Sequence, residues 1–191
     1  MPRPTVVVDP GHGGTDPGAV SVAGFRECDL NLALALKFKA AAPGFGFDVV
    51  LLREDDTFLS LADRAYKTNQ RKPPCVLSFH CNAALSPAAQ GFEVFTSPGN
   101  TPADDLATYI YENLDSMGPY EGRPDYDDDD PDKEAQFYIL RKTVVPAVLI
   151  EFGFITNDRD LRILRADAHQ DTFVEAVAGA VSDWLLERGE Q

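Results

Sequence analysis

Short apolar runs alternate along the chain with longer segments of helical periodicity. Residues 5–8 and 75–79 are almost wholly apolar, a pattern typical of strands that a parallel sheet buries on both faces. Residues 30–42 instead place leucines and Phe38 at spacings of three and four, which is the helical period. The alternation predicts an α/β domain with a largely parallel sheet.

Turn and cap residues set the expected limits of these elements. Pro43-Gly44 ends the first helix, and Ser60 caps the second with Asp63 three residues later. We expect helices at residues 30–42, 60–71, 102–117, 158–166 and 170–187. We expect strands at residues 5–8, 47–52, 75–79, 91–96, 137–140 and 147–150.

Size and composition fit one soluble domain over residues 1–191. No linker rich in Gly, Ser or Pro divides the 191 residues, and we expect no separate wall-binding domain and a monomer. The net charge of −14 argues against nucleic acid and anionic membranes as partners. No apolar run approaches the ~20 residues of a membrane span, so no membrane insertion is expected.

Three further features concern location and surface. The cysteines, Cys28, Cys75 and Cys81, are odd in number and form no CxxC pair, which favours a reducing compartment over a disulfide framework. Residues 1–8 lack the pattern of a signal peptide, so we expect synthesis in the cytoplasm without a leader. Part of the acidity lies in the run at residues 125–132, which we interpret as a solvated loop that serves solubility.

Chemically useful side chains follow the predicted strands. His12 lies in a glycine-rich turn directly after the first strand, and His80 ends the third. Sites form at the carboxyl ends of strands in open α/β sheets. The turn lacks the spacing of phosphate-binding fingerprints, which argues against a phosphate site. Strand alternation places Ser78, His80 and Asn82 on one side of their strand.

Two glutamates complete the set. Glu27 enters the first helix, where it could simply favour the helix dipole. Glu151 follows an apolar strand and precedes Phe152, and burial of a carboxylate there is costly without a partner or a task. Two histidines and one carboxylate form a known catalytic zinc set, and a second glutamate can act as general base. The remaining histidine, His169, lies among polar residues and is expected at the surface.

The sequence resembles the zinc-dependent N-acetylmuramoyl-L-alanine amidases of bacterial cell walls and phage endolysins. The resemblance covers residues 6–185 and rests on several separated motifs in the family's order. These motifs are Val8-Asp9-Pro10-Gly11-His12-Gly13-Gly14, Asp16-Pro17-Gly18-Ala19, Glu27, Arg53 with Asp56, Leu61 with Arg64, Ser78-Phe79-His80-Cys81-Asn82, Gly91-Phe92-Glu93, and the run from Pro146 to Asn157 that contains Glu151.

The resemblance implies both a fold and a chemistry. The fold would be a single α/β domain whose mixed, mostly parallel sheet is flanked by helices on both faces. His12, Glu27 and His80 would hold Zn²⁺, and Glu151 would be the catalytic glutamate. The implied reaction is hydrolysis of the amide between N-acetylmuramic acid and L-alanine in peptidoglycan. Asn82 is a further candidate, as a group that helps to hold the oxyanion.

Two departures from the family pattern matter. Cys28 follows Glu27 where family members often carry Lys, so the surroundings of the metal can differ. The segment between Glu93 and Phe137 is acidic and individual, so substrate contacts do not carry over. Some members carry a helical insert after the third-strand histidine that blocks the zinc site. Residues 82–91 form only a short turn here, and we expect an open site.

Two alternative functions remain open. The metal set also suits a zinc peptidase that cleaves within the stem peptide, and only the resemblance favours the bond next to the sugar. A non-catalytic wall-binding module is the second alternative, against which both glutamates argue. We expect the protein to act in the cell wall or periplasm after release, as an acidic, leaderless lysin would.

Overall fold

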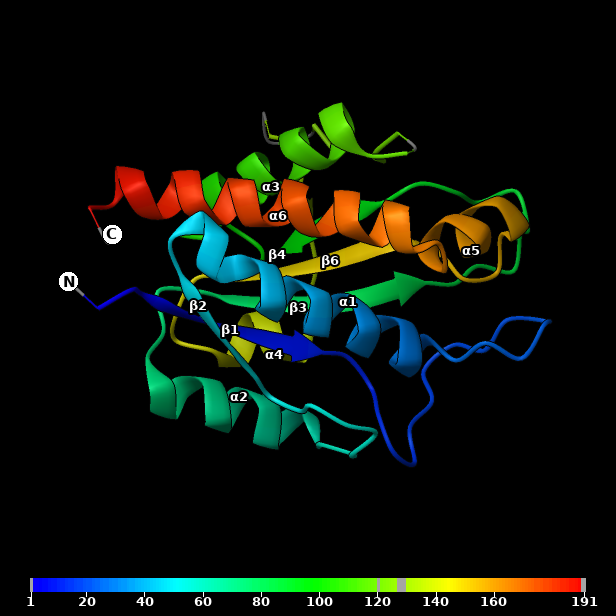
Figure 1. The fold of residues 1–191 in the computed structure, drawn as a ribbon, viewed down its shortest axis with the longest axis horizontal. Coiled ribbons are helices and arrows are strands. Elements are labelled where there is room, and N and C mark those ends of the chain that lie inside the picture. The colour runs from blue at the N-terminus through cyan, green and yellow to red at the C-terminus, as the bar shows by residue number, and fades with distance from the viewer. Residues whose placement is uncertain (1, 120, 127–129, 190–191) are drawn as a thin grey trace.

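The computed structural model describes residues 2–119, 121–126 and 130–189. Within these residues, six strands form one sheet in the order β2-β1-β3-β6-β4-β5 (Figure 1). β2, β1, β3 and β6 run parallel, β4 is antiparallel to β6, and β5 is parallel to β4. The strands are β1 (Thr5–Pro10), β2 (Asp48–Leu51), β3 (Val76–Asn82), β4 (Glu93–Thr96), β5 (Lys133–Glu134) and β6 (Ala147–Phe154).

Helices cover both faces of this sheet. Figure 1 shows α1, α3 and α6 on one face and α2 and α4 on the other. The helices are α1 (Glu27–Ala41), α2 (Leu61–Arg71), α3 (Asp104–Met117), α4 (Tyr138–Lys142), α5 (Asp158–Leu164) and α6 (Asp167–Glu187), and a 3₁₀ turn, η1 (Ala42–Phe45), follows α1. The expected single α/β domain, with a mixed and mostly parallel sheet between helices, is confirmed.

Each face of the sheet has its own apolar core. The larger core lies under α1, α3 and α6 and includes Phe38, Phe79 and Phe173. The smaller core lies under α2 and α4 and includes Val7 and Leu149. Because successive strand residues point to opposite faces, the fully apolar strands expected from the sequence supply both cores at once.

One predicted strand was wrong. Residues 137–140 were expected to be extended, but Tyr138–Lys142 is the short helix α4. Ile139 and Leu140 are consecutive and both pack into the smaller core, which a strand with alternating faces does not allow. The two-residue strand β5 has no counterpart among the expected strands.

The direction of the strands brings the chemically useful residues to one edge. β1, β3 and β6 are parallel, so their carboxyl ends lie at the same edge of the sheet. β4 runs the other way, so its first residue, Glu93, lies at this edge too. β6 extends past its expected end, which places Glu151 inside the strand, in register with His80 on one side and Glu93 on the other.

The acidic run is only partly solvent-exposed. Asp130 is half-buried and Asp132 is buried, where its carboxylate accepts a hydrogen bond of 2.7 Å from the Thr96 hydroxyl. Residues 127–129 of the expected loop lie outside the described residues. None of the described helices is long and apolar enough to cross a membrane.

Candidate metal centre

Three of the predicted site residues meet at the carboxyl edge of the sheet. Nε2 of His12 lies 3.2 Å from Oε1 of Glu27, and Nδ1 of His80 lies 2.9 Å from the same oxygen. One ligand atom from each of the three residues lies within 4.8 Å of the others. Residues from the loop after β1, from α1 and from β3 therefore form one cluster, although His12 and His80 are 68 positions apart.

The backbone before His12 must pass very close to His80. A side chain on Gly11 would place its Cβ 2.7 Å from Nδ1 of His80 and nearer still to other ring atoms. His12 itself has a φ of 60°, in the left-handed region that non-glycine residues seldom occupy. Strained backbone of this kind persists only where its surroundings hold it in place.

Two buried arginines hold this strained loop. Arg53 donates hydrogen bonds to the carbonyl oxygens of Pro10 and Gly11, at 2.8 Å each. Arg64 donates to the carbonyl of His12 at 2.7 Å and forms an ion pair with Asp9. The arginines thus satisfy buried carbonyl groups that the turn would otherwise leave without partners.

Hydrogen bonds also orient the candidate ligands. The Asp16 carboxylate lies 2.8 Å from Nδ1 of His12, which directs Nε2 towards Glu27. Oε2 of Glu27 accepts a bond from the Ala19 amide, and Oε1 accepts one from the Cys81 amide. Partners of this kind fix the ring orientation of metal-binding histidines.

The electrostatics of the cluster are those of a cation site. Burial lowers the pKa of His12, but the Glu27 and Asp16 carboxylates outweigh this and raise it to about 9. Burial raises the pKa of Glu27, but hydrogen bonds to His12 and His80 hold it well below its ordinary value. An ionised carboxylate thus draws positive charge to this point, which a proton or a metal ion can supply.

Glu151 lies beside the cluster without belonging to it. Its Oε2 is buried and has no hydrogen-bond partner among the described residues. Burial, reinforced by the charges of Glu27 and Glu93, raises its pKa to about 7 despite the nearby histidines. A buried carboxylate without a partner is costly, which favours a functional role over a structural one.

The donor set fits a catalytic zinc ion. Two imidazole nitrogens and one carboxylate oxygen are ligands that zinc accepts, and three protein ligands leave a position open. Gly18 leaves room for two of these ligands, since a Cβ there would lie 2.5 Å from Oε2 of Glu27 and 2.7 Å from Cδ2 of His12. His12 and His80 also line a pocket of about 220 Å³, together with Phe58 and Leu61.

The other predicted residues do not belong to the three-ligand cluster. Cys28, Cys75 and Cys81 are buried and form no disulfide. His169 is half-buried near the start of α6. Nδ2 of Asn82 donates to Glu93 at 2.6 Å, so its amide group is directed there.

A second group of potential ligands is already occupied by a cation of the chain. Cys28, Asp29 and Asp56 lie close enough together to hold a metal. The Arg26 guanidinium, however, pairs with both carboxylates, at 2.6 Å from Asp29 and 3.2 Å from Asp56. The guanidinium therefore lies where a metal ion would bind and offsets one of the two carboxylate charges.

The sequence did not predict an ion cluster that forms around the buried Glu93, next to Glu151. Oε1 of Glu93 accepts hydrogen bonds from Nε of Arg123 at 2.9 Å and from Nζ of Lys133 at 2.7 Å. The sequence places Glu93 in a family motif, but its partners Arg123 and Lys133 lie 30 and 40 residues later, in the acidic segment that departs from the family pattern. No spacing rule connects them.

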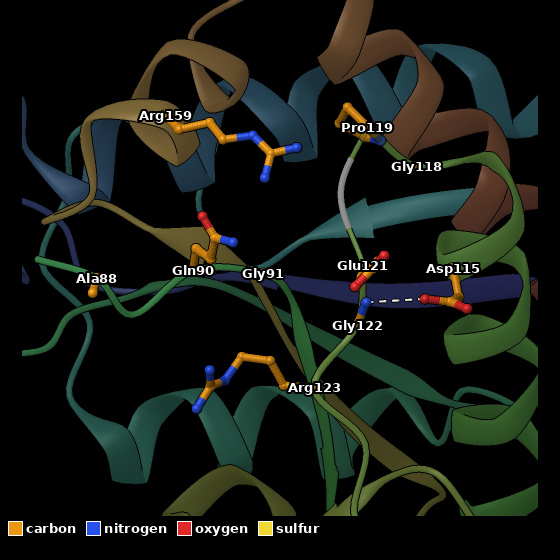
Figure 2. Close-up of a pocket in the computed structure, with 10 residues that line it drawn as sticks. All are labelled: Ala88, Gln90, Gly91, Asp115, Gly118, Pro119, Glu121, Gly122, Arg123 and Arg159. Atoms are coloured by element: carbon orange, nitrogen blue, oxygen red, sulfur yellow. Dashed lines mark hydrogen bonds between the residues drawn. The ribbon is translucent and has the colours of Figure 1, made fainter.

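A larger pocket of about 760 Å³ opens beside this ion cluster. Figure 2 shows the Arg159 and Arg123 side chains, Gln90 and Glu121 around it, and the hydrogen bond from the Gly122 amide to Asp115. Arg123 belongs both to the wall of this pocket and to the ion pair with Glu93. The two features are therefore continuous.

Comparison with known proteins decides the family. The N-acetylmuramoyl-L-alanine amidase family matches residues 6–183. The chain belongs to this family.

Curated relatives and solved structures agree with this assignment. AmiC, an N-acetylmuramoyl-L-alanine amidase of Neisseria meningitidis, is 26% identical over 98% of this chain, which spans 55% of that protein's length. A crystal structure of an N-acetylmuramoyl-L-alanine amidase from Clostridium difficile 630 has a TM-score of 0.92 and 31% identity, and covers 99% of this chain and 100% of that one. The catalytic domain of CwlV, an N-acetylmuramoyl-L-alanine amidase from Bacillus (Paenibacillus) polymyxa, has a TM-score of 0.87 and 28% identity. The match covers 97% of this chain and 98% of that one.

Proposed function

We propose that this amidase hydrolyses the bond between N-acetylmuramic acid and L-alanine in peptidoglycan and that it uses zinc. The observation that carries the proposal is the buried, unpartnered oxygen of Glu151 beside three residues that form a zinc donor set. Family membership supplies the substrate, because the donor set alone does not distinguish one amide from another.

The ligands and the general base have separate tasks in this mechanism. Zinc held by His12, Glu27 and His80 would supply Lewis acidity and lower the pKa of water. Oε2 of Glu151 has no hydrogen-bond partner among the residues that the structure describes, so this atom can accept a proton from the attacking water. It then returns the proton to the departing L-alanine nitrogen.

The pKa of Glu151 suits both proton transfers. A carboxyl with a pKa of about 7 is an effective base and an effective acid near neutral pH. The cause is mainly burial, because Glu151 lies inside β6 between the neighbouring strands β3 and β4. A matching exposed carboxylate would release the proton too readily to return it.

Substitution of each glutamate tests the assignment of roles. Glu151→Gln should keep zinc and fold yet lose at least about a hundredfold in turnover on purified peptidoglycan, the usual scale for a general acid–base group. Glu27→Gln should instead weaken the binding of zinc. The reverse pattern of metal contents would show that the two roles are exchanged, and a fully active Glu151→Gln enzyme would refute the mechanism.

Mass spectrometry of the fragments identifies the bond. Release of intact stem peptides with a free L-alanine amino group supports the proposal. Fragments cut within the stem peptide would instead identify a zinc peptidase, and binding without any fragment would identify a wall-binding module.

We also propose that the protein acts in the cell wall or periplasm, as a monomer. The support for the location is the peptidoglycan substrate of the family. A measurement of molar mass by light scattering tests the monomer, and a mass of twice 20.9 kDa would contradict it.

A further inference from the structure

The ion cluster around Glu93 contains more positive than negative charge. Its single carboxylate is buried, and Arg123 and Lys133 both bind Oε1, while Asn82 binds Oε2. Two cations and one anion leave a surplus of one positive charge. This surplus stands out in a chain whose net charge is −14.

The two cations have donors to spare. Arg123 uses only Nε towards Glu93, and its two terminal nitrogens have no hydrogen-bond partner in the described part of the chain. Lys133 likewise binds only Glu93 among the described residues. Their side chains are 43% and 25% exposed, so a ligand can reach both. A guanidinium with free terminal nitrogens is well suited to bind a carboxylate.

The cluster lies one strand away from the proposed general base. Glu93 pairs with Glu151 across the antiparallel β4–β6 ladder, and Lys133 pairs with Phe95 on the next strand. Directly paired residues in such a ladder have Cα atoms about 4.5–5.5 Å apart. Glu93, to which both cations bind, therefore lies directly beside Glu151 across the ladder.

Peptidoglycan offers one carboxylate close to the scissile amide. The sugars are uncharged, and the first residue of the stem peptide is L-alanine. The second residue is D-glutamate, whose γ-carboxyl continues the chain and whose α-carboxyl is either free or amidated. One alanine therefore separates the scissile amide from this group.

We infer that Arg123 and Lys133 bind the free α-carboxylate of the second stem-peptide residue and select against its amide. The inference rests on the proposed function, because it assumes cleavage next to the sugar. Glu93 is the positioning residue that holds both cations in place. The pocket that Arg123 lines has room for the residues that follow (Figure 2).

A matched pair of substrates tests this selectivity without any change to the protein. The pair consists of soluble disaccharide tripeptides whose second residue carries an α-carboxylate or an α-carboxamide. The wild-type enzyme, loaded with zinc, should show a kcat/KM about tenfold or more higher on the acid, mainly through KM, because a hydrogen bond to a charged group is lost with the amide. Equal kcat/KM values would overturn the inference.

Two variants assign the selectivity to residues. Arg123→Gln and Lys133→Gln should each raise KM for the acid and so bring the ratio of kcat/KM on the acid to kcat/KM on the amide closer to one. Arg141→Gln, which removes an exposed cation of α4, is the matched control and should retain the preference. If both variants retain the preference of the wild type, the carboxylate binds elsewhere and the assignment fails.

Folding and function are separated by two further readouts. Zinc content and the midpoint of thermal unfolding show whether a variant is folded and loaded with metal. If neither variant is folded, the comparison of the two substrates with the wild-type enzyme still tests the selectivity. Failure to cleave either substrate between sugar and alanine would count against the proposed function. Cleavage of both at equal rates would count against this inference alone.

Discussion

At the scale of single residues, the metal site depends on glycines, which have no side chain, as much as on its ligands. The sequence predicted the ligand histidines because each follows a strand, and the structure brings them together with Glu27. It did not reveal how closely Gly11 approaches His80, because that contact joins two strands 69 residues apart. Contacts of this kind depend on packing and leave no local pattern.

Replacement of Gly11 should therefore damage the metal site specifically. In Gly11→Ala the new Cβ would overlap the His80 ring and force it away from Glu27. Affinity for zinc should fall by about 10–100-fold, the usual effect of disturbing a residue that orients a ligand. Competition with a chelator of known affinity measures this change.

Gly44→Ala is the matched control for that experiment. Gly44 lies in the 3₁₀ turn after α1, and a Cβ there would meet no atom within 4 Å. This variant should bind zinc like the wild type. Equal affinities in both variants would show that the His80 ring can move without loss of the site.

At the scale of elements, the sequence predicted most helices and strands because their apolar periods are long and distinct. It failed at residues 137–140, since a four-residue apolar run does not distinguish a strand from a short helix. The smallest strand, β5, exists only because Lys133–Glu134 pairs with β4, and a two-residue segment carries no period of its own. Contacts with residues distant in the sequence decided both cases: core packing for α4 and pairing with β4 for β5.

Helix α2 is joined to the site through Arg64. Its guanidinium forms a buried ion pair with Asp9 and donates to the carbonyls of Pro10 and His12. Arg64→Met should lower the free energy of unfolding by about 3–5 kcal/mol, because it leaves the Asp9 carboxylate buried with one hydroxyl partner, Ser78. Urea denaturation with zinc held constant measures this loss.

Two further variants distinguish the ion pair from helix packing. Asp9→Asn combined with Arg64→Met removes the uncompensated charge and should recover part of the lost stability. Arg71→Met, at the exposed end of the same helix, should change stability by less than about 0.5 kcal/mol. If the double variant is no more stable than Arg64→Met, the cost does not arise from an unpaired Asp9.

At the scale of the whole molecule, the acidic residues include exposed carboxylates and carboxylates that form the site, which the composition does not distinguish. Most acidic residues are exposed and serve solubility, as the charge pattern predicted. The site uses others, Glu27, Glu93 and Glu151, which are well or partly buried and differ in their partners. Composition alone cannot separate these groups, because burial depends on the sheet that orders them.

Asp132 belongs to neither group and should make global stability depend on pH. Burial raises its pKa to about 8, the Thr96 hydrogen bond opposes this, and the charge of Asp130 adds to it. In the unfolded chain an aspartate has a pKa of about 3.9. As pH rises from about 4 to 8, the unfolded state releases a proton that the folded state retains, so the folded state loses stability across this window.

Asp132→Asn should remove that loss, because an amide oxygen can still accept the Thr96 hydrogen bond without a charge. The variant should gain roughly 1–3 kcal/mol over the wild type at pH 8 and much less at pH 4, where the folded wild-type carboxyl is protonated and the unfolded one is still about half protonated. Urea denaturation at both pH values measures the difference, with Glu112→Gln, an exposed acid on α3, as the control. A gain of equal size at both pH values would mean that Asp132 is destabilising for a reason other than its proton.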